Sequence, residues 1–392
     1  MSGFDFDSCP ERRGTDSTKW ARFAGRDVLP AWVADMDFVS APEIMEALRE
    51  RAGHGVFGYA TARRQVLEVV VDYLARRHGW CVEPDWVVFT PALVPCLHGV
   101  IRAVGAAGDA VLTTVPVYPP FLSAPVLSGR SVVRVPMAWE ALRGEWVFDF
   151  DALEAAVTPL ARVLLLCNPH NPLGRVFSRA ELEAVAAFAQ RHDLVVCADE
   201  IHCDLVLDEG ARHVAFGTLG EDVARRSVSL FAASKTFNVA GLLCGYAVIP
   251  DAGLRGRFRK ALAGVANEVN IFGFAALEAA YRYGEPWRRA CVEYLRGNLD
   301  VVMGAVASME GVRIAQRPQA TYLAWLDVRA LGFEDPCAAF EAGGVGLGDG
   351  VDFGAPGFVR LNFGCPRGRL GEILGRVREV ASCQRAENVA RG

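Results

Sequence analysis

One lysine stands out in a chain that uses arginine for almost all of its positive charge. Lysine occurs only at positions 19, 235 and 260, although lysine and arginine together number 41. Lys235 follows Ser234 directly after the apolar run 228–233. A lysine amine can form a Schiff base, which a guanidinium cannot. A lysine whose stem packs at a strand end while its amine reaches water is the structural alternative. The pattern makes Lys235 a candidate for covalent catalysis.

Asp199 is a second candidate, because it ends the apolar run 194–198. A carboxylate at the end of a buried strand is costly unless it meets a positive partner. A protonated pyridine nitrogen would be such a partner, and the carboxylate would keep that ring electron-withdrawing. An aspartate that caps a helix is the alternative interpretation.

The segment 168–175, Asn-Pro-His-Asn-Pro-Leu-Gly-Arg, predicts a tight turn after a strand. An amide held in such a turn, that of Asn171, can donate a hydrogen bond to a phenolate-like oxygen. A structural turn alone explains the two prolines, but it does not require both asparagines.

Two further segments supply weaker signals. The stretch 89–95 precedes a predicted helix of about 96–107, and the N–H groups at a helix start, here near Leu93 and Val94, can bind phosphate. Every helix has such a start. Tyr118 lies in a proline-rich loop after a strand, where its ring could stack on a flat cofactor. Packing within the loop explains the tyrosine equally well.

Arg360 lies in the predicted strand 357–362, with its side chain expected to point inward. Its planar fork suits bidentate binding of a carboxylate, and an internal salt bridge is the alternative. Together the candidates supply a Schiff-base amine, an acid partner for a ring nitrogen, a phenolate donor, a phosphate cradle and a carboxylate clamp. Pyridoxal-phosphate chemistry on amino acids requires these groups.

The elements that would position these residues alternate between short apolar strands and helices from about residue 85 to 250. Such alternation predicts a parallel sheet covered on both faces, with the ligand at the carboxyl ends of the strands. The predicted strands are 110–114, 162–167, 194–198, 228–232 and 243–249, and Ser178 with Glu181 begins a helix to about 192. The polar residues expected to converge on one cleft are Asn168, Asn171, Asp199, His202, Ser234 and Lys235.

The pattern changes near residue 284, where a long helix over roughly 286–308 is predicted. We therefore expect a large domain over 46–285 that binds the cofactor. A smaller domain should combine 1–45 with 286–392.

Composition excludes several classes of function. The net charge is -5 and no basic run is present, which argues against nucleic-acid binding. The sequence contains no uninterrupted apolar stretch of about 18 residues, so no membrane span is predicted. The polar N-terminal residues argue against a signal peptide. The 11 cysteines are scattered without CxxC pairs. We expect reduced thiols in a cytoplasmic protein and no metal.

At this point the chain resembles the fold-type-I pyridoxal-phosphate superfamily, an α/β fold with a mostly parallel sheet and a smaller α+β domain. Within it the chain is similar to the MalY/PatB-like carbon–sulfur β-lyase branch, of cystathionine β-lyase type. His170 with Leu173, and the segment 32–38, favour this branch over ordinary aminotransferases. The segments that carry the resemblance are 13–17, 32–38, 56–59, 114–121, 166–175, 199–204, 234–241 and 360–367.

The resemblance implies roles around a pyridoxal 5'-phosphate cofactor. Lys235 resembles the Schiff-base lysine, and Asp199 the partner of the pyridine nitrogen. Asn171 would contact the ring hydroxyl, and Tyr118 would stack on the ring beside the substrate. His202 would lie near the outer edge of the ring.

The remaining roles concern the phosphate and the substrate. Ser234, with the N–H groups near Leu93 and Val94, would hold the phosphate. Arg360, with the backbone at Ala34, would bind the α-carboxylate of a small amino-acid substrate.

Tyr59 in this branch reaches the neighbouring subunit's phosphate. A homodimer with shared active sites is therefore expected.

Four departures from the branch pattern stand out. Ala92 replaces a usual glycine, Gly245 a small polar residue, the pair 242–243 an often polar pair, and Ala320 a frequent glycine. All four positions are expected near the pocket. They put cystathionine itself in doubt as the substrate.

The reaction expected from the resemblance is elimination from an S-substituted L-cysteine, giving a thiol, pyruvate and ammonia. The cysteine conjugate could be cystathionine-like or come from a specialised pathway. An aminotransferase, or a decarboxylating or oxidatively deaminating enzyme on the same substrate class, would use the same residues. A regulatory protein that keeps the fold without turnover is the alternative from another class.

Overall fold

The centre of the protein is a seven-stranded sheet with the order β2-β10-β9-β8-β7-β3-β4. The structure is a computed structural model that describes residues 3–266 and 268–391. The strands of this sheet are β2 (Val87–Thr90), β3 (Ala110–Val115), β4 (Ser131–Pro136), β7 (Ala161–Cys167), β8 (Val195–Asp199), β9 (Ser227–Phe231) and β10 (Gly245–Val248). The predicted strands are therefore confirmed, and the sheet is mostly parallel.

Strand β10 differs from the predicted parallel arrangement, because it runs antiparallel to both β9 and β2. A parallel neighbour of β9 would need a crossover, usually through a helix. The connection from β9 to β10 contains only the short η3 (Ala240–Leu242). The chain therefore reverses direction, and β10 pairs with β9. The connection between the two strands contains Lys235, which lies at the carboxyl edge of the sheet.

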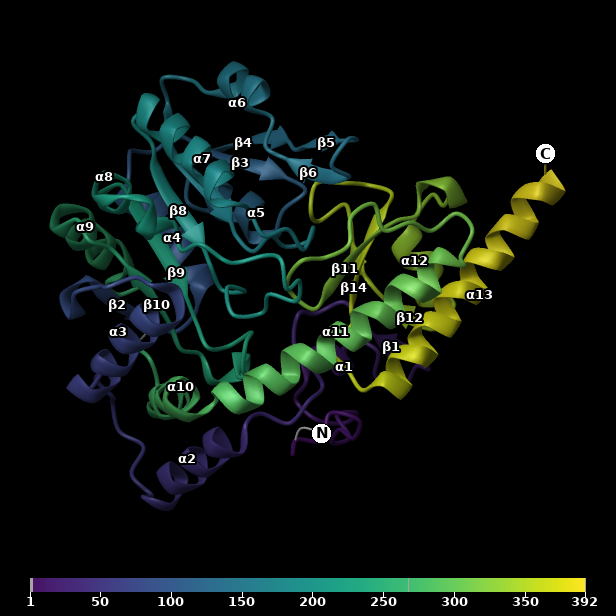
Figure 1. Ribbon diagram of the computed structural model, residues 1–392, viewed down its shortest axis with the longest axis horizontal. Coiled ribbons are helices and arrows are strands. Elements are labelled where there is room, and N and C mark those ends of the chain that lie inside the picture. The colour runs from purple at the N-terminus through teal and green to yellow at the C-terminus, as the bar shows by residue number, and fades with distance from the viewer. Residues whose placement is uncertain (1–2, 267, 392) are drawn as a thin grey trace.

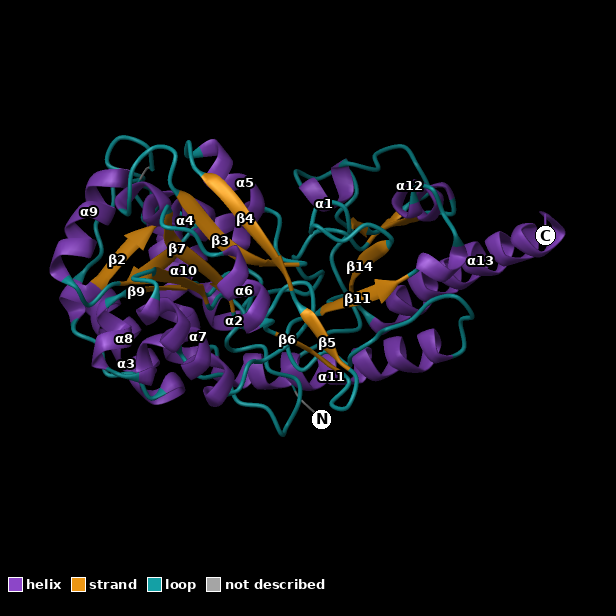
Figure 2. Ribbon diagram, turned by 90° about the horizontal axis from the view of Figure 1, so that it is seen from above, coloured by secondary structure: helices purple, strands orange, loops and turns teal. Residues whose placement is uncertain are grey.

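Helices cover both faces of the sheet (Figures 1 and 2). In β7, Val163 and Leu165 pack into one apolar cluster with α4 and α9, while Leu164 and Leu166 pack into another with α6 and α7. Side chains of a strand alternate between its two faces, so this near-continuous apolar run is buried on both sides. The four helices are α4 (Leu93–Ala103), α6 (Phe150–Ala156), α7 (Arg179–Arg191) and α9 (Ala252–Leu262).

The sequence predicts the first residues of two helices, and the structure confirms one of these starts and corrects the other. Helix α7 begins with the predicted capping box of Ser178 and Glu181. Helix α4 begins at Leu93 and not near 96. Pro95 lies in the first turn of α4, where a missing N–H costs nothing because the first N–H groups have no partner within the helix. The N–H groups of Leu93 and Val94 therefore belong to the helix start itself.

A smaller antiparallel sheet lies in the C-terminal part, with the order β11-β14-β13. The long helix α11 (Glu285–Ala307) leads into it, as predicted, and α13 (Arg367–Arg391) packs against α11 (Figure 1). The strands are β11 (Leu323–Asp327), β13 (Gly348–Asp349) and β14 (Phe358–Asn362). The apolar face of this sheet is covered by these helices, and Arg360 is buried on β14.

The N-terminal segment joins the C-terminal part, because β1 (Leu29–Pro30) pairs in parallel with β12 (Val345–Gly346). The expected domain boundary near residue 45 lies inside α2 (Pro42–Gly53), which packs against α10 (Ile271–Tyr283). The division into 46–285 and the two flanking segments stays a prediction.

The remaining elements are α1 (Thr18–Ala21), α3 (Arg64–His78), α5 (Pro120–Leu127), α8 (Glu221–Arg225), α12 (Pro336–Ala342), β5 (Ala138–Glu140), β6 (Glu145–Val147), η1 (Pro84–Trp86), η2 (Phe216–Leu219) and η4 (Arg329–Leu331). Within residues 3–266 and 268–391, no helix is long and apolar enough to cross a membrane.

Candidate active site

A cavity of about 160 Å³ lies at the carboxyl edge of the large sheet. Its floor comes from strand ends: Cys167 and Asp199 are the last residues of β7 and β8. The predicted site residues that line it are Ala34, Leu93, Val94, Tyr118, Asn171, Asp199, His202, Ser234 and Lys235. Residues from six separate stretches of sequence thus meet where the carboxyl ends of parallel strands are expected to hold a ligand.

Lys235 follows β9 and lies at the cavity, with its amine in a polar contact to the N-terminal segment. Its Nζ donates a hydrogen bond to the carbonyl oxygen of Ala34 at 2.6 Å. Burial, followed by the positive charge of Arg360, lowers the pKa of Lys235 to about 8, although Asp35 and Asp199 oppose this shift. The lowered pKa therefore makes a minor fraction of the amine neutral near physiological pH, far more than for an ordinary lysine, and a neutral amine can act as a nucleophile or a base.

Asp199 is buried at the end of β8, and burial raises its pKa to about 6. The N–H of Ile201 donates to its Oδ1 at 3.1 Å, and the charge of Lys235 also favours the ionised form. The raised pKa shows that these two contributions do not fully compensate the loss of water. A cationic group in the cavity would do so, as expected for a carboxylate that faces a protonated ring nitrogen.

Arg360 reaches the site from β14 and is anchored on both sides. Its Nη1 donates to Oδ1 of Asn171 at 3.0 Å, and its Nη2 donates to the carbonyl oxygen of Trp32 at 2.6 Å. The guanidinium lies 4.7 Å from the ring centroid of Phe353. Burial lowers the pKa of Arg360 to about 10, so the group stays cationic at neutral pH. The alternative of an internal salt bridge does not apply, because both of these acceptors are neutral.

The arginine also retains donor capacity. Its buried Nε has no hydrogen-bond partner among the described residues. Because Asn171 uses its oxygen to accept from Arg360, its amide nitrogen remains as the donor toward the cavity. One anchor thus sets the orientation of two predicted site residues.

His202 and Tyr118 both line the cavity. Burial, followed by the charges of Lys235 and Arg360, lowers the pKa of His202 to about 3, so its imidazole is neutral. Its Nδ1 is buried without a hydrogen-bond partner in the described part of the chain. Burial, and then the charge of Asp199, raises the pKa of Tyr118, so its hydroxyl stays protonated. Both side chains are neutral groups in the lining of the cavity.

Asn168 does not join the cavity, contrary to the prediction. Its Oδ1 accepts a hydrogen bond from the N–H of Phe177 at 3.1 Å, and its Nδ2 lies 3.5 Å from Nδ1 of His213. These contacts close the turn that follows β7. Asn168 therefore serves the turn, as the structural alternative suggested for this segment, and of the two asparagines only Asn171 lines the cavity.

The departures from the branch pattern have local explanations. Ala92 adopts φ -162°, an extended conformation open to any residue, so this position does not need the positive-φ freedom of glycine. A Cβ on Gly245 would lie 2.5 Å from Cδ1 of Leu93, so this glycine makes room for the leucine at the start of α4. Of the pair 242–243, Leu243 lines the cavity and has a positive φ of 51°. Ala320 is buried against Val206 in a β-bridge and is not among the lining residues.

Tyr59 is fully exposed and is not among the residues that line the cavity. It lies in an irregular segment between α2 and α3, where Val56 and Phe57 are exposed as well. Tyr59 and Asn168 are therefore predicted residues that the single chain does not bring to the cavity, and Arg360 reaches it through its bond to Asn171.

Tyr322 is a site residue that the sequence interpretation missed. It is buried beside His202, with ring centroids 6.1 Å apart, and its hydroxyl donates to the carbonyl oxygen of Ala34 at 2.9 Å. The same carbonyl therefore accepts from Tyr322 and from Lys235. A clue was present in the sequence, since Tyr322 follows the departure at Ala320, but only the folded chain shows the shared acceptor.

The arrangement fits pyridoxal 5'-phosphate. A buried carboxylate with an uncompensated charge, an amide donor on Asn171 and an amine of lowered pKa face one cavity. The same cavity is lined by Ser234 and the start of α4, an N-terminus that favours an anion. Each part suits one group of that cofactor: ring nitrogen, ring hydroxyl, aldehyde carbon and phosphate.

This fold and this site define a fold-type-I pyridoxal-phosphate enzyme. The chain belongs to the aminotransferase class I and II family, which matches residues 33–377. It is similar to cystathionine beta-lyase PatB of Bacillus subtilis, with 37% identity over 96% of this chain and 100% of that protein.

Solved structures show the same relationship. The crystal structure of OvoB superposes with a TM-score of 0.93 and 43% identity, covering 96% of this chain and 99% of the other. The PLP-bound C-S lyase from Staphylococcus hominis superposes with a TM-score of 0.90 and 27% identity, covering 97% and 98%.

Proposed function

We propose that this protein is a pyridoxal-phosphate-dependent carbon–sulfur β-lyase that converts an S-substituted L-cysteine to a thiol, pyruvate and ammonia. The carrying observation is that Lys235, with a lowered pKa, and Asp199, with a raised pKa, line one cavity, while the cationic Arg360 donates to Asn171 in its lining. The similarity to a cystathionine beta-lyase and to a C-S lyase supports the choice of elimination over transamination.

The bound cofactor supplies an electron sink that weakens the bonds to the substrate's α-carbon. Lys235 is the residue placed to move the α-proton, because its amine has a lowered pKa and lies at the cavity. Asp199 would pair with the ring nitrogen and favour its protonated form. Tyr118 would pack against the ring, and the amide nitrogen of Asn171 would donate to the ring hydroxyl. His202, held neutral, would lie beside the ring without adding charge.

Arg360 binds the substrate's α-carboxylate with the donors that Asn171 and Trp32 leave free. A charge-assisted, bidentate pair fixes the direction of the bonds at the α-carbon. The bond held perpendicular to the ring is the one weakened, so Arg360 governs reaction type as well as affinity. The backbone at Ala34 borders the same space.

We further propose a homodimer in which Tyr59 of the partner subunit completes the phosphate site. Two observations support it. The lining residues at the phosphate end include Ser234, Leu93 and Val94 but no arginine. Tyr59 lies fully exposed with Val56 and Phe57, an apolar segment that a second subunit would cover. A cytoplasmic location stays a prediction.

The test is a product assay on purified protein supplied with pyridoxal 5'-phosphate. A set of S-substituted L-cysteines, cystathionine included, is screened for free thiol and for pyruvate in equal amounts. Equal yields of thiol, pyruvate and ammonia support the lyase. Keto-acid formation that depends on an added amino-group acceptor, without thiol release, would instead identify an aminotransferase.

A further inference from the structure

The segment 32–38, called here the strap, carries backbone carbonyls that accept hydrogen bonds from the side chains of Arg360, Lys235 and Asn362. Trp32 accepts from Arg360 at 2.6 Å, and Ala34 accepts from Lys235 at 2.6 Å. Asn362, two residues after Arg360, donates through Nδ2 to the carbonyls on either side of Ala34, at 2.6 and 2.7 Å. The strap has no helix or strand hydrogen bonds of its own. Apart from one backbone bond, from the N–H of Asp37 to the carbonyl of Gly364 at 2.9 Å, the strap is held by side chains that bind it.

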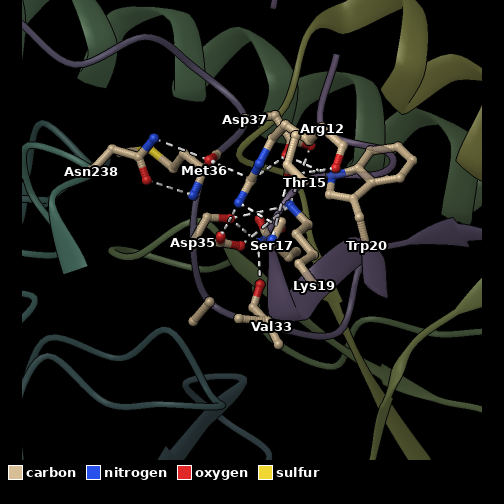
Figure 3. A network of polar contacts seen from close by, with 12 residues as sticks. Arg12, Thr15, Ser17, Lys19, Trp20, Val33, Asp35, Met36, Asp37 and Asn238 are labelled. Atoms are coloured by element: carbon tan, nitrogen blue, oxygen red, sulfur yellow. Dashed lines mark hydrogen bonds and ion pairs between the residues drawn. The ribbon is translucent and has the colours of Figure 1, made fainter. Parts of the chain in front are cut away.

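One set of side-chain hydrogen bonds to the strap comes from Asn238, three residues after Lys235. Its Oδ1 accepts from the N–H of Met36 at 2.9 Å, and its Nδ2 donates to the carbonyls of Met36 and Phe38 at 3.0 and 2.8 Å (Figure 3). The loop that carries the lysine is thereby tied to the strap.

A second set of contacts to the strap is an ion network around Asp35 and Asp37 (Figure 3). Arg12 pairs with both carboxylates at 2.7 Å each, and Arg369 approaches Asp37 at 3.2 Å. Lys19 lies 3.2 Å from Asp37 and is only 2% exposed. Burial acts to raise the pKa of Asp37, but the charges of Lys19, Arg369 and Arg12 outweigh it and lower that pKa. Both strap carboxylates are thus paired with cationic side chains.

The geometry explains why residue 19 is a lysine in a chain that otherwise uses arginine. The Lys19 ammonium donates hydrogen bonds to Oδ2 of Asp37 and to the backbone carbonyl of Asp35, at 3.2 Å each, and forms an ion pair with Oδ1 of Asp35 at 3.7 Å. An ammonium carries three N–H groups on a single atom, whereas a guanidinium spreads its donors over a plane. An arginine in this buried slot has no single nitrogen that could contact the same three oxygens.

We propose that Lys19 is a second functional lysine, a positioning residue that fixes the backbone of Asp35 so that the adjacent Ala34 carbonyl holds the Lys235 amine. This inference rests on the proposed function, in which Lys235 moves the α-proton. The Ala34 carbonyl gives the amine a fixed place whenever it is not bonded to the cofactor. A buried ion network adds little to stability by itself, and here it sets the position of a catalytic group.

The first test measures the Lys235 amine directly, in cofactor-free protein. Trace acetylation followed by mass spectrometry is readable because the chain has only three lysines. Lys19→Arg keeps the charge but should displace the Ala34 carbonyl. Loss of one hydrogen bond should speed acetylation of Lys235 by a factor of about 2 to 10. Added Nα-acetyl-lysine is the rate standard, and Lys260→Arg, at an exposed position on α9, is the matched control that leaves Lys235 unchanged.

The second test uses the holoenzyme and an S-substituted L-cysteine with deuterium at the α-carbon. A misplaced base should lower kcat in Lys19→Arg by about 10- to 100-fold. It should also raise the α-deuterium isotope effect, with KM and cofactor content kept. A merely structural role would reduce the amount of active enzyme and leave the isotope effect as in the wild type.

Arg12→Gln is the second variant in case Lys19→Arg does not fold, since the Arg12 side chain is 23% exposed and its loss also frees Asp35. Wild-type acetylation rates together with a wild-type isotope effect, in a folded variant, would overturn the proposal. If the wild-type enzyme releases no thiol, the lyase assignment fails, but the acetylation comparison still decides whether Lys19 positions Lys235.

Discussion

The Lys235 amine donates a 2.6 Å hydrogen bond to the carbonyl of Ala34, a residue 201 positions earlier in the chain. Ala34 belongs to the N-terminal segment that pairs with the C-terminal part through β1 and β12, whereas Lys235 follows a strand of the large sheet. Arg360 reaches the same segment at Trp32. The base and the carboxylate clamp therefore take their positions from one short stretch of backbone, so a change in that stretch should alter both binding and proton transfer.

Replacement of Lys235 by alanine should abolish turnover, because no other lysine lies at the cavity. The variant should also lose the visible absorbance of covalently held cofactor. Absorbance spectra and a thiol-release assay measure both effects. Lys260→Ala, on the exposed face of α9, is the control and should keep both. Full turnover in Lys235→Ala would remove the basis of the assignment.

The Lys235 amine should titrate near pH 8 in cofactor-free protein, since burial and the charge of Arg360 lower its pKa to about 8. Acetylation requires the neutral amine, so the rate should rise with pH and level off above this value. Arg360→Gln removes the cation that favours the neutral form, whereas Asp35 and Asp199 remain. The acetylation curve of this variant should therefore shift to higher pH. A shift in the opposite direction would contradict the assigned electrostatic coupling.

Replacement of Asp199 by asparagine should stabilise the cofactor-free protein while it destroys activity. The folded-state pKa of about 6 lies above the ordinary value of 3.8. Ionisation therefore favours the unfolded chain, and stability is lost as pH rises from about 4 to 6. At pH 8 the variant should gain about 1–3 kcal/mol in the free energy of unfolding. Urea unfolding at pH 8 and at pH 3.5 tests this, because the gain should vanish at the lower pH.

Arg360→Ala should lower kcat/KM by roughly 30- to 4000-fold. Loss of one partner of a desolvated, charge-assisted pair costs about 2–5 kcal/mol. The loss should be smaller for amines that lack the carboxylate, because they never use the clamp. The cofactor absorbance should survive, since the arginine is not assigned to the ring or the phosphate. Equal losses for both kinds of substrate would point to a structural arginine.

Tyr59→Phe should weaken cofactor retention without changing the fold of the single chain, because the Tyr59 side chain is fully exposed. Dialysis against buffer, followed by absorbance, measures the cofactor that remains. Light scattering on the wild-type protein should give twice the mass of one chain. A monomer that is fully active at the assay concentration would refute the shared site.

The sequence by itself determined five of the seven strands of the large sheet and most of the site residues that follow them. Apolar runs such as 162–167 can only be buried, and polar residues directly after them must lie at the carboxyl edge of a parallel sheet. Lys235, Asp199 and Asn171 were predicted to meet for this reason, and they line one cavity. The scarcity of lysine singled out Lys235, because a Schiff base requires an amine, whereas surface charge can be supplied by arginine.

The tertiary structure decided what depends on contacts between distant segments. Asn168 and Asn171 look alike in sequence, but Asn168 bonds to Phe177 and leaves the site. Strand β10 runs antiparallel to β9, and its connection contains only the short η3 and no crossover helix. The acceptors around Lys19 and the shared carbonyl of Ala34 come from long-range hydrogen bonds. Such bonds carry no local sequence signal, because their geometry is set only when separate elements pack together.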